Sequence, residues 1–362
     1  MKQTPAIEAT DLAIGYNGTR GKKNCLNSNL NLQLKRGEVT SLLGSNGAGK
    51  STLLRTLAGF QPELGGSIAI EGRNRAAIPQ KELSRLIGVV LTERSMAGTL
   101  RVRELVSLGR HPYTGFFGML KSRDHEIIDH AMQQVGIAHK ADSYIAEISD
   151  GERQKAMIAK VLAQECPIIL LDEPTAFLDI TSRIELMVLL RELAVVGNKS
   201  ILLSTHDIEL ALTLSDQLWL LKKHEGIVCG APEDLVLDNS VGTYFGKENI
   251  SFDTHTGRLA YKTNGEKRAY IESCGDKAYW LANAVKKLGY SLSDTPDGNT
   301  LVIKWNTPDT AITLHLPNGK EATAASIGEM VEVIKAITVP FLSSSCLDSA
   351  RHDVLFPSGV NH

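Results

Sequence analysis

One stretch of the chain decides its fold: Gly44-Ser45-Asn46-Gly47-Ala48-Gly49-Lys50-Ser51, which matches the pattern G-x-x-x-x-G-K-[ST]. It follows a short apolar run, residues 39–43, and precedes a run of good helix formers, residues 51–58. This order of strand, loop and helix suits a polyphosphate, because glycines let backbone N–H groups wrap the anion and the helix N-terminus adds unpaired donors. A chance match in a chain of this length is expected about once in a hundred. We therefore predict a nucleoside-triphosphate site at this loop.

The loop also predicts individual roles. Lys50 is expected to reach the β- and γ-phosphates, so we count it with the catalytic groups, and the Ser51 hydroxyl is expected to bind Mg²⁺. The predicted nucleotide contacts are the residues of the loop and of the helix start: Gly44, Ser45, Asn46, Gly47, Ala48, Gly49, Lys50, Ser51 and Thr52.

Two further apolar runs end in polar residues that suit catalysis. Residues 168–171 lead to Asp172 and Glu173, and residues 201–204 are closely followed by His206. Open parallel sheets bind ligands at the carboxyl ends of their strands, so these side chains are expected beside the phosphate loop. Asp172 is predicted to hold Mg²⁺, Glu173 to polarise the attacking water, and His206 to donate to the γ-phosphate. Taken alone, the acidic pair also fits a surface turn, and His206 a surface or capping group.

Composition argues against several classes of function. The chain has 362 residues, 39 basic and 41 acidic, and its net charge of −2 gives no sign of a nucleic-acid surface. No stretch approaches the roughly 20 apolar residues of a spanning helix. The N-terminus does not resemble a signal peptide, and the five cysteines are widely spaced without a metal-type C-x-x-C pair. We expect reduced thiols, no nucleic-acid partner and no export.

Patterning divides the chain into three parts. Residues 1–246 alternate short apolar runs with helical periodicity, which predicts an α/β domain. Within it, a helical subdomain is expected at about residues 95–165. The sequence pattern changes in residues 247–337, where shorter strand-like segments are separated by turn signals. This pattern predicts a small α+β domain. Residues 338–362 lack clean periodicity and are predicted to be a tail.

The small α+β domain can be outlined further. Strands are predicted at residues 301–305 and 311–316, because these runs lie beside Pro-Asp-Gly and Pro-Asn-Gly turns. Helices are predicted at residues 277–288 and 326–337, the first with Trp280, Val285 and Leu288 facing inward. Regulation, dimer stabilisation and effector binding are all open as roles for this domain.

The segment before the carboxylate strand makes the assignment more specific. The signature motif of ABC ATPases, usually written LSGGQ, is similar to the stretch Ile148-Ser149-Asp150-Gly151-Glu152-Arg153-Gln154. The D-loop of the same family resembles Phe177-Leu178-Asp179, and its switch-histidine motif resembles Thr205-His206-Asp207. The resemblance covers about residues 5–246. It implies a P-loop NTPase of the ABC cassette type, with a mixed sheet core and a helical subdomain.

The resemblance also implies a site shared by two copies of the chain. In this family two cassettes pack head to tail, so Ser149, Gly151 and Glu152 of one copy would close over ATP held by the other, with Asp179 in the adjoining D-loop. Tyr16 stands where the family places an aromatic side chain that stacks on adenine, although a structural tyrosine at a strand end is the alternative. The implied cofactors are ATP and Mg²⁺.

This sequence departs from the family pattern at two places. In the signature, Asp150 replaces a glycine and Glu152 a glutamine, which we expect to be tolerated because Ser149 and Gly151 remain. After residues 87–91 the family usually has a glutamine that senses Mg²⁺ and the membrane subunit, whereas this chain has Thr92-Glu93. We predict both as candidate metal ligands, since an anion there would favour the metal and disfavour ATP.

A last stretch points to a subfamily. Gly109-Arg110-His111-Pro112-Tyr113, followed by Gly115-Phe116-Phe117-Gly118, looks like the helical insert of cassettes that drive uptake of iron-siderophore, haem or cobalamin. Residues 101–108 would then form a helix facing the membrane subunit, the alternative being an ordinary solvated amphipathic helix.

An importer of this kind implies a set of partners and a location. The partners are membrane-spanning permease subunits, a second copy of the chain and, indirectly, a periplasmic or surface binding protein. The location is peripheral, at the cytoplasmic face of the inner (plasma) membrane. The alternative function is a soluble cassette that acts as a mechanical clamp in repair, translation or cofactor assembly, which the single set of motifs disfavours.

Overall fold

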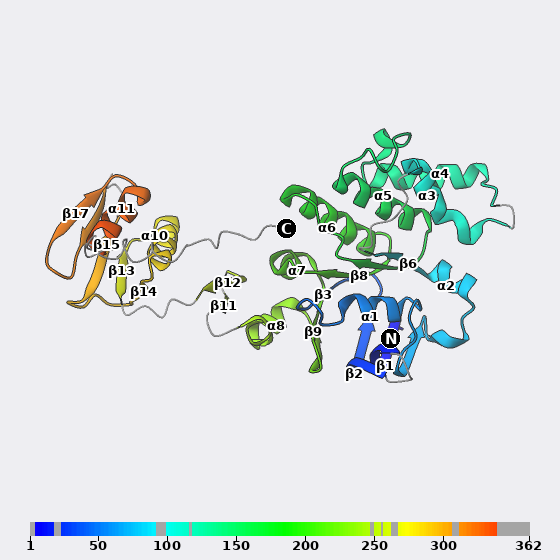
Figure 1. Cartoon of the computed structure of the whole chain (residues 1–362), viewed down its shortest axis with the longest axis horizontal. Helices are drawn as coiled ribbons and strands as arrows, with labels where there is room; N and C mark the ends of the chain where they lie inside the picture. The colour runs from blue at the N-terminus through cyan, green and yellow to red at the C-terminus, as the bar shows by residue number, and fades with distance from the viewer. Residues whose placement is uncertain are drawn as a thin grey trace, which may run out of the picture. The chain divides into compact units, whose positions relative to one another are not determined.

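The computed structural model describes residues 4–17, 23–91, 99–115, 118–246, 250–254, 256–261, 267–305 and 311–338. The chain divides into two compact units, Met1–Ala260 and Tyr261–His362, each drawn in Figure 1. The division falls after the residue 246 expected from the sequence. It does so because β11 (Ile250–Asp253), which pairs with β12 (Arg258–Tyr261), carries Phe252. This side chain packs against the buried cluster that contains Val241.

A largely parallel sheet runs through the first unit. Its strand order is β10-β9-β3-β8-β7-β6, parallel from β9 to β6, with β10 antiparallel to β9. The bounds are β3 (Val39–Leu43), β6 (Ile87–Val90), β7 (Ile168–Asp172), β8 (Ser200–Thr205), β9 (Gln217–Lys222) and β10 (Gly226–Gly230). All residues of β3, β7 and β8 are buried, as expected for central strands covered on both faces.

The two faces of this sheet meet different hydrophobic cores. On β7, Ile169 and Leu171 belong to the core under the helical part, whereas Ile168 and Leu170 belong to the core that contains α1 (Lys50–Leu57). This division follows from the alternation of side chains along a strand. The α1 core is shared with an antiparallel sheet of order β2-β1-β4-β5. Its bounds are β1 (Ile7–Asn17), β2 (Lys23–Leu34), β4 (Gly65–Ile70) and β5 (Arg73–Asn74), and α2 (Gln80–Leu86) follows it.

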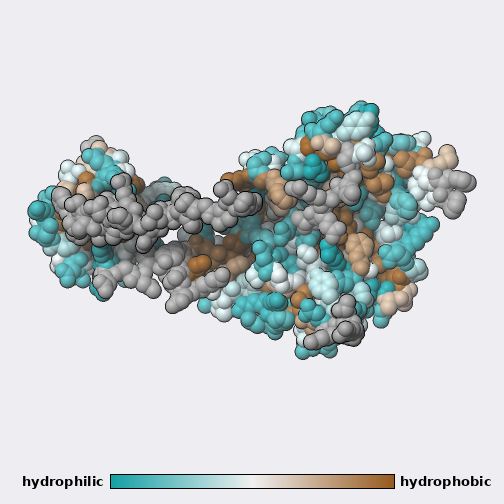
Figure 2. Space-filling view, viewed as in Figure 1, coloured by the Kyte–Doolittle hydropathy of each residue, from teal (hydrophilic) through white to brown (hydrophobic). Residues whose placement is uncertain are grey.

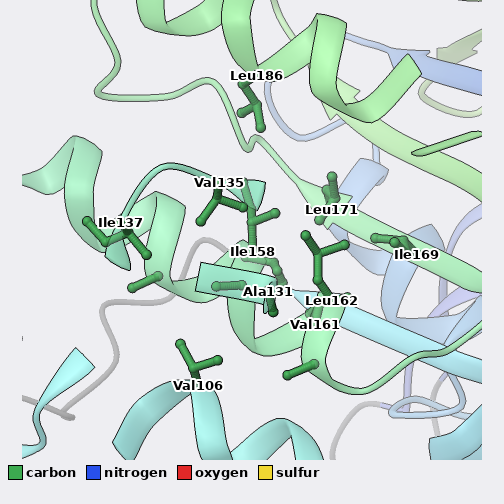
Figure 3. Packing of buried hydrophobic residues seen from close by; sticks show 14 of the residues in the cluster. Val106, Ala131, Val135, Ile137, Ile158, Val161, Leu162, Ile169, Leu171 and Leu186 are labelled. Atoms are coloured by element: carbon green, nitrogen blue, oxygen red, sulfur yellow. The ribbon is translucent and has the colours of Figure 1, made fainter. Parts of the chain in front are cut away.

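The helical part consists of α3 (Val102–Ser107), α4 (Ser122–Gln134) and α5 (Asp150–Ala163), which pack on one another. Figure 3 shows their apolar side chains meeting those of β7 and α6: Val106, Ala131, Val135, Ile137, Ile158, Val161, Leu162, Ile169, Leu171 and Leu186. Helix α3 lies within the predicted range 101–108. The packing is close at Gly109, where a Cβ would stand 2.1 Å from the carbonyl oxygen of Lys160.

Arg110 ties the helical part together. Its buried guanidinium donates to Asp124 Oδ1 and to Glu165 Oε2, both at 2.8 Å, and lies over the ring of Tyr113, 4.3 Å from its centre. The conspicuous stretch around Arg110 therefore has a structural role inside the chain.

The remaining helices of the first unit follow the strands of the central sheet. They are α6 (Ile180–Val195), α7 (Ile208–Leu214), α8 (Pro232–Leu237) and α9 (Ser240–Phe245). On the face shown in Figure 2, hydrophilic and hydrophobic residues of this unit are interspersed. No helix in the described ranges is both long and apolar enough to cross a bilayer.

The second unit has its own sheet and core. The strand order is β14-β13-β15-β16-β17, with β13 parallel to β14 and β15 and the remaining pairs antiparallel. The bounds are β13 (Arg268–Glu272), β14 (Ser291–Leu292), β15 (Thr300–Lys304), β16 (Ile312–His315), β17 (Glu321–Ala324), α10 (Gly275–Lys287) and α11 (Ile327–Thr338).

Sequence patterning found part of this unit and missed part. The predicted strands and helices correspond to β15, β16, α10 and α11, whereas β13, β14 and β17 were not predicted. The prediction that Trp280 faces inward is wrong, because 58% of this residue is exposed and Leu281 is buried beside it. The same prediction is confirmed for Val285, which is buried in the core, and for Leu288, which packs against it.

Candidate active site

The phosphate loop has the backbone conformation that its glycines allow. Gly47 and Gly49 have φ angles of 77° and 104°, in the left-handed region that favours glycine. At Gly44 a Cβ would stand 3.0 Å from the carbonyl oxygen of Leu221, so the loop passes close to β9. A Cβ on Gly47, in contrast, would meet no atom within 4 Å in the described part of the chain. The open side of the loop therefore leaves room for a ligand.

Helix α1 begins at this loop without a side-chain cap. Its N-cap residue is Gly49, which has no side chain to accept a hydrogen bond from the first turn. Unpaired N–H groups at a helix N-terminus bind anions well. The loop and α1 therefore fit a phosphate group by geometry as well as by sequence.

Lys50 lies at the centre of the site. Its ammonium group donates to the carbonyl oxygen of Gly44 at 2.8 Å and lies 4.0 Å from Glu173 Oε1. Burial lowers the pKa of Lys50, and the charges of Glu173 and Asp172 oppose that shift. Burial also strengthens the interaction of the ammonium group with a phosphate that enters the site, because screening by water is reduced.

The end of β7 presents the two carboxylates in different settings. Ser204 of β8, opposite Asp172 in the register, donates its hydroxyl to Asp172 Oδ1 at 2.6 Å and accepts from the backbone N–H of Glu173 at 2.9 Å. Asp172 is buried, whereas the Glu173 side chain is 31% exposed. Glu173 also has a φ of 50°, an unfavourable value for a non-glycine residue and one that is common at functional sites.

His206 connects the two sides of the site. Its Nε2 lies 2.8 Å from Glu173 Oε1 and 3.2 Å from Lys50 Nζ. One ring nitrogen serves one of these partners at a time: protonated, Nε2 donates to Glu173, and unprotonated, it accepts from Lys50. The parallel register of β3 with β8, which pairs Leu43 with Thr205, brings His206 to this position.

Two oxygen-bearing side chains fit a magnesium ion. Asp172 supplies a buried carboxylate, and Ser51, at the start of α1, supplies a hydroxyl. Mg²⁺ prefers oxygen ligands of this kind and usually keeps several waters. A cavity of about 630 Å³ opens beside Glu173 and His206, so water can reach both side chains.

Tyr16 lies beside the start of α1. Its hydroxyl shares a 2.8 Å hydrogen bond with Thr52 Oγ1, and the residue is 45% exposed. An exposed ring fixed next to the phosphate loop is available for stacking on a base. Sequence reasoning missed Asn27, which donates to the carbonyl oxygen of Ala48 in the loop and accepts from Gly226 N–H. A polar residue inside strand β2 was its only signal.

The signature residues lie elsewhere. Ser149 is the N-cap of α5, with Gly151 and Glu152 in the first turn, and Asp179 is the N-cap of α6. Helix α5 belongs to the core on one face of the central sheet and α1 to the core on the other (Figure 1). The structure therefore brings together the loop, Asp172, Glu173 and His206, and places the signature separately. Thr92 and Glu93 lie outside the described residues.

The comparisons with known proteins agree with this architecture. The model of the ABC transporter family matches residues 27–176, which include the phosphate loop, the signature and the carboxylate pair. The chain belongs to the ATP-binding proteins of ABC transporters, and it is an ATPase whose hydrolysis of ATP is coupled to transport.

Two relatives and one solved structure are similar to this chain over most of their own length. A ferric enterobactin transport ATP-binding protein of Escherichia coli is 35% identical over 68% of this chain and 89% of its own. A cobalamin import ATP-binding protein of Halobacterium salinarum is 29% identical over 81% of this chain and 75% of its own. The matched part of this chain is longer than the first unit, Met1–Ala260. The solved structure of a metal-chelate type ABC transporter, inward-facing, has a TM-score of 0.57 and 27% identity over 67% of this chain and 89% of its own.

Proposed function

We propose that the chain is the nucleotide-binding subunit of an importer for a metal chelate or cobalamin-type substrate, such as an iron-siderophore, haem or cobalamin. The observation that carries the ATP chemistry is the contact of Lys50, Glu173 and His206 within 4.0 Å at the ends of the central strands. The substrate class rests on what the similar proteins transport, since nothing in this site would touch a transported molecule.

Each group at the strand ends has a defined task in this proposal. The loop N–H groups and Lys50 bind the phosphates, and Tyr16 stacks on the adenine. Ser51 and Asp172 hold Mg²⁺, which supplies positive charge to the phosphate oxygens when bound. Glu173 orients and polarises a water for attack on the γ-phosphate, and His206 fixes Glu173 through its 2.8 Å contact or donates to the phosphate. Thr92 and Glu93 complete the list of candidate metal ligands.

The second half of the site comes from another copy in this proposal. Ser149 and Gly151 stand at the exposed N-terminus of α5, and α5 and the chain's own phosphate loop belong to opposite faces of the sheet. A head-to-tail homodimer would bring that N-terminus, with Glu152 and Asp179 near it, to ATP bound by the partner. Closure driven by ATP and reset by hydrolysis would then move permease subunits held at the membrane.

The proposal includes a location and an organisation. The chain acts peripherally at the cytoplasmic face of the inner (plasma) membrane, where permease subunits receive substrate from a periplasmic or surface binding protein. The proposed ATPase domain comprises residues 1–246 and the proposed α+β domain follows it up to residue 337, with the second compact unit beginning at Tyr261. The tail predicted at residues 338–362 lies outside the described residues from residue 339 on.

Glu173→Gln tests the catalytic half of the proposal. Without the carboxylate the water is no longer polarised, so phosphate release should fall by about 10²- to 10⁴-fold while ATP still binds. With ATP and Mg²⁺, light scattering should show a trapped dimer, whereas ADP should leave monomers. Full hydrolysis by the variant would refute the assignment of Glu173.

Copurification with a polytopic membrane protein tests the importer against a soluble clamp.

A further inference from the structure

The N-terminus of α5 is covered by one of its own side chains. Glu152 Oε2 accepts a hydrogen bond from the backbone N–H of Ser149 at 2.9 Å and from the Ser149 hydroxyl at 3.0 Å. In return, the Glu152 N–H donates to Ser149 Oγ at 3.2 Å. This reciprocal capping box uses the hydroxyl proton of Ser149 and the N-cap N–H together. Both donors point at a carboxylate within the same chain.

The other oxygen of Glu152 faces a cation. Lys140 Nζ lies 3.4 Å from Glu152 Oε1, and His139 Nε2 lies 4.0 Å from the same atom. Both residues belong to the short helical turn Ala138–Lys140, which follows α4. Glu152 thus contacts the donors of Ser149 through one carboxylate oxygen and the ammonium group of Lys140 through the other.

The charge of this carboxylate opposes the task of the helix that carries it. The hydrogen bond from the Ser149 backbone lowers the pKa of Glu152, so the side chain is anionic at neutral pH. A helix N-terminus attracts an anion through its free N–H groups. An anion already held there competes with any phosphate that approaches, both for the donors and through repulsion of like charge.

We propose that Glu152 restrains the ATP-driven closure of two copies, because it holds the Ser149 donors that the γ-phosphate bound by the second copy needs, and that Lys140 receives Glu152 when closure occurs. This inference rests on the proposed head-to-tail site and names the group that sets its ATP requirement. Glu152 is a positioning residue that acts through Ser149. The restraint is adjustable, because any shift of the turn that carries Lys140 changes the hold on Glu152.

Glu152→Gln separates this role from simple capping. Glutamine at this place in a capping box still accepts from the N-cap N–H, so a purely structural Glu152 predicts wild-type behaviour. Loss of the charge alone should favour phosphate at the helix N-terminus by about fivefold. The matched control is Glu329→Gln, because at the start of α11 the Glu329 N–H also donates to a serine hydroxyl, that of Ser326, while its carboxylate accepts from the Ala325 N–H.

The experiment measures dimer formation against ATP concentration in chains that also carry Glu173→Gln, by light scattering with Mg²⁺ present. We expect Glu152→Gln to lower the ATP concentration at half-maximal dimer by about fivefold and Glu329→Gln to leave it unchanged. Lys140→Met should raise it by a similar factor, and the double variant with Glu152→Gln should match Glu152→Gln alone, since the lysine acts only through the carboxylate. Lys335→Met, which removes a surface lysine paired with Glu332, is the control for Lys140→Met.

The outcomes separate the two proposals. If Glu173→Gln alone forms no ATP-dependent dimer, the head-to-tail site is wrong, and the restraint falls with it. If that dimer forms but Glu152→Gln leaves the half-maximal ATP concentration unchanged or raises it, only the restraint is refuted. In chains with Glu173 intact, Glu152→Gln should lower KM for ATP about fivefold, whereas a folding defect lowers the fraction of active enzyme and leaves KM unchanged.

Discussion

Two helix N-termini are assigned the phosphate contacts in the proposed mechanism, and they are built in opposite ways. Helix α1 starts after Gly49, which has no side chain to cap it. Helix α5 starts at Ser149, whose hydroxyl and N–H are both engaged by Glu152. The first N-terminus is ready for a phosphate in the chain as it stands, whereas the second has to exchange one anion for another.

This difference follows from the roles proposed for the two helices. A loop that binds ATP before the two copies close gains from donors that are already available, and Lys50 adds a buried cation to them. A surface that binds only on closure gains from a competing group, because the competitor keeps the open form populated until ATP arrives. Three predictions test this difference between the N-termini of α1 and α5.

The largest effect is expected at α1. Lys50→Ala removes the one ammonium group in contact with Gly44, Glu173 and His206, so ATPase activity should fall by about 100-fold or more. ATP affinity, measured with a fluorescent analogue, should fall as well, because Lys50 is the ammonium group that the proposal places against the phosphates. Lys335→Ala serves as the control, and near-normal turnover in Lys50→Ala would contradict the assignment.

A smaller effect is expected at α5. Ser149→Ala removes the N-cap, which costs about 1 kcal/mol of stability, and removes the hydroxyl offered to the second copy. Turnover should fall by about tenfold while ATP binding to the monomer is kept. Ser149→Thr retains both the cap and the hydroxyl and should restore most activity. Ser326→Ala, which removes the equivalent cap of α11, should cost stability without this loss of turnover.

The smallest effect is on the pH dependence of stability. The folded chain lowers the pKa of Glu152 from its ordinary value of 4.5, mainly through the Ser149 N–H, so the carboxylate stabilises the fold above that value. The contribution is lost as the pH falls through the lower, folded pKa. Melting curves of wild type and Glu152→Gln should therefore differ slightly at pH 7 and converge in acid. A constant difference down to pH 3 would show that the carboxylate is not held as described.

Features encoded in contiguous residues could be predicted well. The phosphate loop lies between β3 and α1 because a buried strand, glycines at positive φ and helix formers follow one another directly. The strand before Asp172 and Glu173 was visible for a similar reason, as a run of apolar residues with both faces covered. In the second unit, α10 was located and Val285 was placed in its core, but Trp280 was wrongly placed there, because both Trp280 and Leu281 are apolar and only packing chose between them.

Features that depend on strands far apart in the sequence could not be predicted. Ser204 was missed although it bridges Asp172 and Glu173, because only the register of β7 with β8 makes them neighbours. The same holds for Lys140, whose contact with Glu152 depends on the turn after α4 packing near the start of α5. The hairpin of β11 and β12 joined the first unit for the reason that Phe252 finds an apolar cluster there.

The sequence by itself determined which residues carry charge and hydrogen-bonding groups, and which local backbone conformations they adopt, since glycine content, apolar runs and capping residues act over a few positions. It therefore determined the loop, the carboxylate pair and the capping box. Tertiary structure alone decided which of these groups meet. The parallel order of β3, β8 and β7 brings Lys50, His206 and Glu173 together, and the two faces of the same sheet separate Ser149 from the phosphate loop of its own chain.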